Sequence, residues 1–291
     1  MTLREDTARK IRPQGALSAI RSLLVHVEPG AAAQPRLAAA VALAEKLDAH
    51  LTGLGAEMSQ AAGVSDPFGL LGSDWTVELA ALLQDNLKRA ETAFRAKSAG
   101  LDVEWLAVQA YPAAAMARLA RGADLVIAGG APVTFTDDDR VAQTAELVLQ
   151  CGRPVLVVPP TGGRLRGEAV VVAWKDTREA RRAVADALPF LQAAEEVVVQ
   201  EVCGKESHDA AQAHTAAVVQ NLKRHGVLAR AKVTVGAADD AADELEATAH
   251  GLGADLIVAG GYGHTRLGEW VFGGVTRNLL QQPDHFVLFS H

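Results

Sequence analysis

The chain contains 291 residues, of which 49% are hydrophobic and 22% are charged. This length and composition predict one large or two ordinary globular domains with a sizeable core, and they exclude a disordered or collagen-like chain. The 28 basic and 35 acidic residues give a net charge of −7. Nucleic acid and anionic membrane surfaces are therefore disfavoured as partners, because both carry negative charge.

The lack of a recognisable targeting signal and the pattern of cysteine usage favour a cytoplasmic location. No stretch reaches the roughly 18–20 apolar residues that cross a bilayer, and residues 1–13 are not followed by the apolar core of a secretory signal. The two cysteines, Cys151 and Cys203, form no paired motif, as is typical of a reducing compartment. We expect a cytoplasmic protein.

The first half begins with a β-type run at Val25–Val27. Glu28 follows it, and we interpret this acidic group as a leftover of the fold rather than a working contact. The helical spacing of the apolar Leu37, Val41 and Ala44 then predicts a core-facing helix. The chain thus starts with a strand followed by a helix.

An internal repeat runs through the chain. Residues 122–130 and 253–261 are identical at seven of nine positions, at an offset of 131, and the same offset carries Val155–Val158 onto Phe286–Phe289. Near the starts of the two halves the offset is 147. The first half therefore has about 16 extra residues, and the Gly-, Ser- and Pro-containing stretch 59–74 is the expected insertion.

This repeat predicts two tandem domains, residues 18–159 and 167–291. A Pro/Gly-containing linker, Pro159–Gly163 continued by Arg164–Gly167, joins them. Duplication is the natural interpretation, because the matching segments follow one another without a gap.

The second half alternates β-branched runs with helical patterns. The runs predict strands at Ala169–Trp174, Val197–Val202, Ala231–Val235, Asp255–Gly260 and Phe286–Phe289. Between them we expect a helix over Thr177–Leu191, with Thr177 as its N-cap, and a helix over Asp209–His225 that Gly226 terminates.

Continuous apolar runs separated by helices predict a parallel sheet covered on both faces. The expected fold is α/β, with two tandem doubly wound, Rossmann-like domains. Similar surfaces on duplicated domains predict a pseudo-dimer that packs through the final strands, Val155–Val158 and Phe286–Phe289. Ligands of such sheets bind beyond the carboxyl ends of the strands, so the site is expected just after Trp174 and Ala259.

A glycine-rich loop follows the fourth strand of the second half. Two residues separate Gly260 from Gly263, and nine separate Gly263 from Gly273–Gly274. Glycine permits close backbone approach, and Gly273–Gly274 fall where the next helix begins, with its unpaired N–H groups and positive dipole end. An anionic phosphate fits this pattern. Ordinary strand-to-helix turns also need glycine, so both interpretations stay open.

This glycine spacing occurs together with the run Ala254-Asp-Leu-Ile-Val258 and the segments Val172-Ala-Trp174 and Arg178-Glu-Ala180. On the basis of these motifs, residues 20–291 resemble the tandem bacterial form of the universal stress protein family. In that family the glycine loop holds the triphosphate and ribose of ATP, and an acidic residue near the adenine and ribose ends the first strand. The resemblance implies ATP binding in the second half, and a stress-response role as a signalling or protective factor that acts through conformation and an unknown protein partner. A homodimer of whole chains is a further expectation.

The candidate nucleotide site combines these positions with their neighbours. It consists of Ala173, Trp174, Lys175, Gly260, Gly263, His264, Arg266, Gly273, Gly274 and Val275. Gly274 stands where the family has Ser or Thr, so a hydroxyl contact to phosphate, worth about 1.5–3 kcal/mol, is absent. Lys175 stands where the family's acidic residue is expected, and His264 and Arg266 add donors close to the loop.

The first half departs from the glycine pattern. At the same offset Pro132 replaces Gly263, while Ala142 and Gln143 replace Gly273–Gly274. Proline removes an N–H donor, and three aspartates at 137–139 would repel a triphosphate. Nucleotide is therefore expected in the second half alone.

No residue pattern predicts catalysis or a metal site. His208 and His214 lie six apart, off a common helix face, and we interpret the histidines as solvated. Slow ATP hydrolysis stays open, without a candidate base. One alternative is a nucleotide-independent scaffold or dimerisation protein of the same fold, which Gly274 and Lys175 favour. Another, an adenylate-forming enzyme, lacks its pyrophosphate-loop motif.

Overall fold

The computed structural model describes residues 17–58, 73–130, 143–237, 239–261, 274–281 and 283–291. The first half contains β1 (Ser22–His26), α1 (Gln34–Leu47), β2 (His50–Ala56), α2 (Ser73–Lys97), β3 (Val103–Val108), α3 (Pro112–Leu119), β4 (Leu125–Gly129), α4 (Thr144–Gln150) and β5 (Val155–Val158). The second half contains β6 (Ala169–Ala173), α5 (Arg178–Asp186), α6 (Leu188–Ala193), β7 (Glu196–Cys203), α7 (His208–Arg224), β8 (Ala229–Val235), α8 (Ala241–Leu252), β9 (Leu256–Gly260), α9 (Gly274–Gln281) and β10 (Phe286–Ser290).

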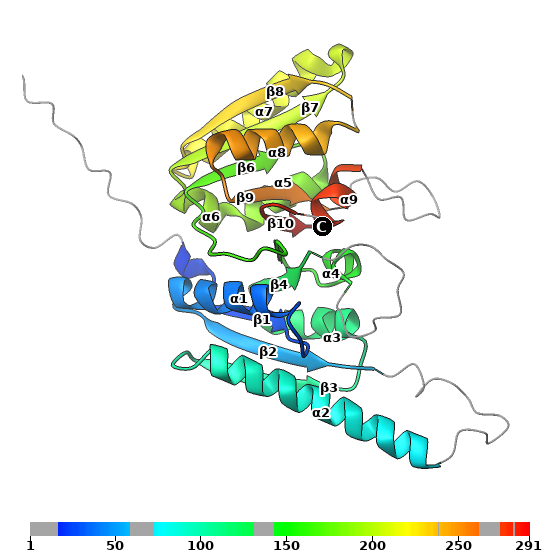
Figure 1. The fold of residues 1–291 in the computed structure, drawn as a ribbon. Helices are drawn as coiled ribbons and strands as arrows, with labels where there is room; N and C mark the ends of the chain where they lie inside the picture. Colours follow the sequence, from blue (N-terminus) through cyan, green and yellow to red (C-terminus); the bar gives the residue numbers. More distant parts are fainter. Residues whose placement is uncertain (1–16, 59–72, 131–142, 238, 262–273, 282) are drawn as a thin grey trace, which may run out of the picture.

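All strands join one ten-stranded sheet in the order β3-β2-β1-β4-β5-β10-β9-β6-β7-β8 (Figure 1). Each half therefore winds in the same way, with its first strand at the centre and its second and third strands outward on one side. The strands within each half pair in parallel. The predicted α/β fold with two doubly wound units is confirmed.

The two halves meet through their final strands. β5 and β10 pair antiparallel, with Val155 opposite Phe289 and Val157 opposite Val287. The prediction that Val155–Val158 and Phe286–Phe289 form the shared edge is confirmed. Pairing these two apolar strands removes an edge that each half would otherwise expose.

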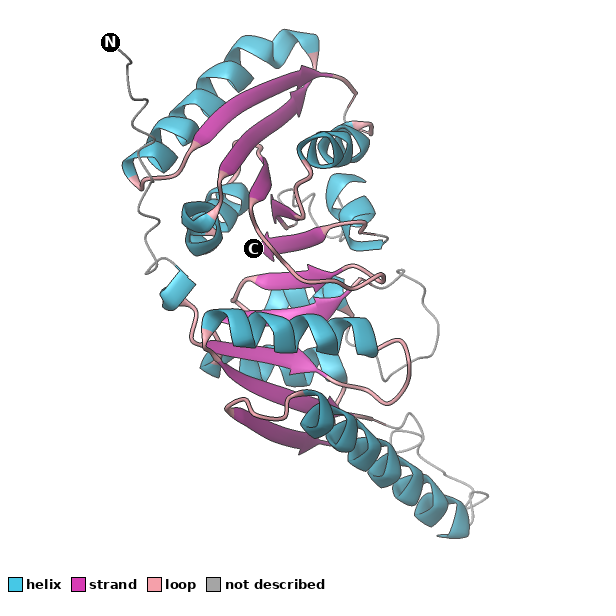
Figure 2. Ribbon diagram, turned by 60° about the vertical axis from the view of Figure 1, so that its left-hand side comes forward, coloured by secondary structure: helices cyan, strands magenta, loops and turns pink. Residues whose placement is uncertain are grey.

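Helices cover both faces of the sheet (Figure 2). The core on one face draws on α1, α2, α5, α6 and α7, and the core on the other draws on α3, α4, α8 and α9. Both cores continue across the β5–β10 seam, so the halves share their apolar interior. Among the described helices, none is long and apolar enough to span a membrane.

The repeated Gly-Ala-Asp segment has a structural role in both halves. The Asp124 carboxylate accepts hydrogen bonds from the backbone N–H groups of Arg21–Ser22, at 2.9 and 3.0 Å. The Asp255 carboxylate accepts equivalent bonds from Arg166–Gly167, at 2.6 and 2.9 Å. Each aspartate thus fixes the chain where it enters the first strand of its half, which explains why the segment recurs.

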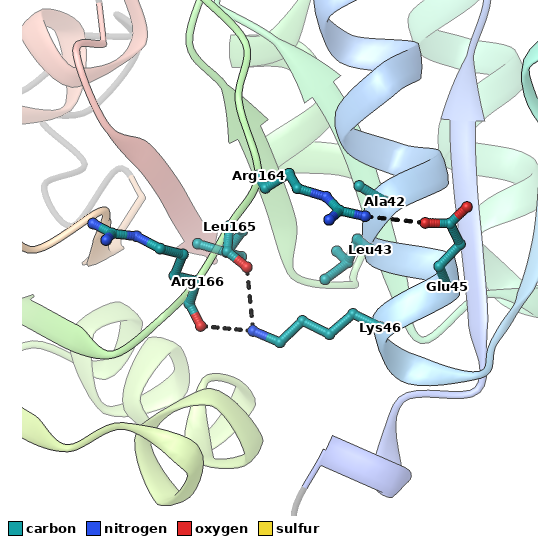
Figure 3. A pocket seen from close by; sticks show the side chains of 7 residues that line it. All are labelled: Ala42, Leu43, Glu45, Lys46, Arg164, Leu165 and Arg166. Atoms are coloured by element: carbon teal, nitrogen blue, oxygen red, sulfur yellow. Dashed lines mark hydrogen bonds and ion pairs between the residues drawn. The ribbon is translucent and has the colours of Figure 1, made fainter.

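The predicted linker is held against both halves. Lys46 of α1 donates to the carbonyl oxygens of Leu165 and Arg166, at 3.2 and 2.6 Å, and Arg164 donates to Glu45 at 3.2 Å. These contacts surround a cavity of about 420 Å³ (Figure 3). Burial lowers the pKa of Lys46. Together with the bonds to Asp255, these contacts make the linker a brace between the halves.

The helix predicted over Thr177–Leu191 is two helices. α5 ends at Asp186 and α6 begins at Leu188, with Pro189 in its first turn. Proline has no N–H to continue the α5 hydrogen bonds, so the helix breaks before it. Thr177 is confirmed as the N-cap, because its side chain accepts a hydrogen bond from the Ala180 N–H at 3.3 Å.

Candidate functional site

The predicted site lies where the winding of the second half reverses direction. β6 pairs with β9 on one side and with β7 on the other, and ligands of doubly wound sheets bind at this point, beyond the carboxyl ends of the strands. Ala173 ends β6 and pairs with Ala259, so Ala173 and Gly260 lie at the same edge of the sheet.

The residues after β6 connect this edge to α5. Trp174 is buried, and its backbone N–H donates to the Gln200 carbonyl at 2.8 Å. The indole Nε1 is buried without a hydrogen-bond partner in the described part of the chain. Lys175 is exposed, and its carbonyl accepts from the Thr177 N–H at 2.7 Å. The loop therefore presents a cationic side chain beside an enclosed indole.

Gly260 is required by helix packing. A Cβ on Gly260 would lie 2.6 Å from the Ala180 backbone nitrogen and 2.7 Å from the Glu179 carbonyl carbon. Real Cβ atoms essentially never come this close to other atoms. The first turn of α5 thus rests directly on the end of β9, and this glycine has a packing role whether or not a ligand binds.

The next glycine is required by contact between the halves. A Cβ on Gly261 would lie 2.6 Å from the side chain of Val148 in α4. At the equivalent position of the first half, a Cβ on Gly130 would lie 2.7 Å from the Pro283 ring. The two Gly-Gly pairs of the repeat therefore admit close packing across the seam.

The far end of the predicted glycine pattern begins a helix. α9 starts at Gly274, and the half-buried Val275 packs against the same core as α8. α5 packs against the opposite core, so the first turns of α5 and α9 belong to opposite faces of the sheet. The remaining predicted residues lie outside the described part of the chain; they are Gly263, His264, Arg266 and Gly273.

A charged cluster adjoins the end of β6 and was missed by the sequence analysis. Asp176 accepts from Arg181 at 2.7 Å, and His214 of α7 lies 3.9 Å from Asp176 and 3.8 Å from Glu201. The His214 side chain is 38% exposed, so it is partly solvated, as expected, and it also faces these two carboxylates. Burial raises the pKa of Glu201, and the negative charge of Asp176 adds to this effect. Residues 197–201 of β7 are all buried, and the sequence does not show that α7 brings His214 beside Glu201.

The corresponding edge of the first half is filled by side chains. Arg36 of α1 donates to the Glu28 carboxylate and, through Nε at 3.0 Å, to the His26 carbonyl. The His26 imidazole Nδ1 lies 3.2 Å from Glu28. All three side chains are buried, with 6%, 8% and 2% of Arg36, Glu28 and His26 exposed.

Glu28 therefore takes part in a buried structural ion pair, and its interpretation as a leftover of the fold is wrong. Burial alone would raise the pKa of Glu28, but His26 and the charge of Arg36 outweigh it and lower that pKa below its ordinary value. The sequence showed an acid after the strand, but it did not show that a helix residue eight positions later reaches it.

The comparisons with known proteins agree with this architecture. No protein-family model matches the sequence, and no curated protein matches it. Among solved structures, a universal stress protein from Archaeoglobus fulgidus DSM 4304 superimposes with a TM-score of 0.68 at 13% identity, covering 92% of this chain and 95% of the other.

Two Pseudomonas aeruginosa structures are also similar over nearly their whole length. A putative universal stress protein from strain UCBPP-PA14 has a TM-score of 0.60 at 20% identity, covering 94% of each chain. A functionally unknown protein from strain PAO1 has a TM-score of 0.58 at 20% identity, covering 95% of this chain and 94% of the other.

The molecule is thus a doubly wound α/β protein, and the end of β6 is the switch point at which such sheets form their ligand-binding crevice. Its fold over both halves is that of the universal stress proteins, which confirms at the level of the fold the resemblance found in the sequence.

Proposed function

We propose that the chain is a universal stress protein whose second half, residues 167–291, binds an adenine nucleotide, with ATP as the first candidate. The first half, residues 18–159, is a partner that binds no nucleotide. The start of α9 at Gly274 is the observation that carries the proposal. It places a helix N-terminus after β9, whose carboxyl end lies at the edge of the sheet where ligands of this fold bind. The unpaired N–H groups of such a helix N-terminus suit a phosphate group.

The contrast between the two halves supports binding in the second half alone. In the first half the Arg36 side chain lies against Gly129 at the end of β4, whereas the three atoms nearest to a Cβ on Gly260 belong to the α5 backbone. Lys175 adds a positive charge on the β6 side of the crevice, which favours an anionic ligand.

The role we propose is that of a stress-response factor that works through conformation and a protein partner. Among the described side chains, no group of three or more His, Cys, Asp or Glu residues could hold a metal ion. The proposal assigns no catalytic residue, and a slow hydrolysis of ATP stays compatible with it.

A nucleotide-independent scaffold is the second candidate, and a specific observation favours it. Gly260 and Gly261 are both needed for packing against neighbouring backbone and side chains. Gly260, which belongs to the predicted nucleotide pattern, and its neighbour Gly261 would therefore persist in a protein that binds nothing. Only a binding measurement separates the two candidates.

Titration calorimetry with ATP tests the proposal. Wild-type protein is expected to bind ATP, and Gly263→Pro is expected to lose binding while keeping its thermal stability, because proline removes a donor and restricts the loop. Gly274→Ser is expected to bind ATP about fivefold more tightly or better, because the hydroxyl can donate to a phosphate oxygen. Absence of binding by the wild type and Gly274→Ser, with stability unchanged, would favour the scaffold.

A further inference from the structure

The buried Arg36 guanidinium has contacts on three sides. Glu28 accepts from Nη2, the His26 carbonyl at the end of β1 accepts from Nε at 3.0 Å, and Gly129 at the end of β4 leaves room for Nη1. A Cβ on Gly129 would lie 2.8 Å from Nη1. The guanidinium therefore bridges β1 and β4 at the point where the first half reverses its winding.

Comparison with the second half shows why there is room for the Arg36 side chain between α1 and β4. Arg36 is the third residue of α1, and Ala180 is the third residue of α5. Residues 27–33 connect β1 to α1, whereas only residues 174–177 connect β6 to α5. In the second half the Ala180 backbone rests on Gly260 itself. In the first half a side chain intervenes between the helix and the glycine.

The chemistry of the space suits a guanidinium group. A carboxylate and a carbonyl oxygen accept from one planar fork of donors, which arginine offers in a fixed geometry and lysine does not. The carboxylate is buried, but the hydrogen bond with His26 and the charge of Arg36 lower its pKa, so it is an anion at neutral pH.

We propose that the crevice of the first half is a guanidinium-binding site which Arg36 of the same chain fills permanently. Glu28, the His26 carbonyl and the Gly129 backbone form the site, and α1 delivers the occupant. The first half thus completes its crevice without an external ligand. The proposal is independent of nucleotide binding in the second half.

Chemical rescue tests it. Arg36→Ala empties the site, and Arg95→Ala serves as the control, because Arg95 of the same half pairs with Glu91 while 56% of its side chain is exposed. Thermal unfolding is followed in 0–50 mM guanidinium chloride against sodium chloride of equal concentration. We expect Arg36→Ala to unfold several degrees below the wild type. Guanidinium should raise its midpoint in a saturable way.

The wild type and Arg95→Ala should show no such rise, since guanidinium has no empty site in either. A midpoint for Arg36→Ala that falls or stays level with guanidinium, as in the control, would overturn the proposal.

Should Arg36→Ala fail to fold, Arg36→Met keeps much of the side-chain volume and removes only the charged fork. Glu28 would then be a buried anion without its cation, and its pKa should rise. The melting point of Arg36→Met should therefore rise relative to that of the wild type when the pH is lowered from 7 to 5. A constant difference between the two proteins over this range would contradict the assignment of Glu28 as the anion of the site.

Discussion

Replacement of Gly260 by alanine tests the close packing of α5 on β9. The added methyl group would lie 2.6 Å from the Ala180 nitrogen, and about 0.8 Å of movement is needed to reach the 3.4 Å of ordinary contact. The opposing atoms belong to the backbone of the first turn of α5, so no rotamer change relieves the clash. Either the helix or the strand must shift.

The loss of stability expected for Gly260→Ala follows from the same geometry. Overpacking of this kind costs about 1–3 kcal/mol. Gly251 provides a matched control, because it lies in α8 and a Cβ there meets no atom within 4 Å. Gly251→Ala should stabilise the protein by about 0.5–1 kcal/mol through helix propensity. The two single-methyl variants should therefore differ by roughly 1.5–4 kcal/mol.

Urea unfolding, followed by circular dichroism, measures both variants against the wild type. Equal m-values would show that the change lies in stability rather than in the surface exposed on unfolding. If Gly260→Ala is as stable as the wild type or as Gly251→Ala, then α5 does not rest on Gly260 and the reasoning is refuted.

Two further substitutions probe the carboxylates of Glu201 and Asp255. Burial raises the pKa of Glu201, so its ionisation destabilises the folded state increasingly as pH rises above about 4.3, the ordinary value. Glu201→Gln should thus be more stable than the wild type at pH 7 and lose this advantage near pH 4, whereas the exposed Glu206→Gln should show little pH-dependent difference in thermal melts. Asp255→Asn removes one charge-assisted bond to Arg166–Gly167 and should lower stability by about 1.5–3 kcal/mol in urea unfolding. The exposed Asp48→Asn is its control, and equal losses for both would contradict the strand-entry role of Asp255.

Features that depend on local sequence periodicity were predictable. Apolar runs located the second-half strands to within a few residues, as for Asp255–Gly260 against the observed Leu256–Gly260. The repeat indicated which strands end the two halves, and the need to cover an apolar edge predicted their pairing. The break before Pro189 was missed although a proline inside a helix removes a needed donor, because the helical pattern continues on both sides of it.

Features that depend on contacts between distant segments were not predictable. The glycine pattern indicated a tight approach at Gly260, but it gave no sign that the neighbour is the α5 backbone rather than a ligand. Likewise, neither Arg36 nor Glu28 is unusual in the sequence, and their pairing depends on how α1 lies over β1. Predicted residues such as Gly263 lie outside the described part of the chain, so their role stays a prediction.

The number of nucleotides bound per chain is the most direct test of the account. Equilibrium dialysis of the full chain against ATP, with GTP as a competitor, measures it. The account predicts one ATP per chain, because Arg36 occupies the end of β1 in the first half, whereas a helix begins at Gly274 after β9 in the second. Poor displacement by GTP follows from the proposed preference for an adenine nucleotide. Two ATP molecules per chain would contradict the filled crevice of the first half, and none would contradict nucleotide binding itself.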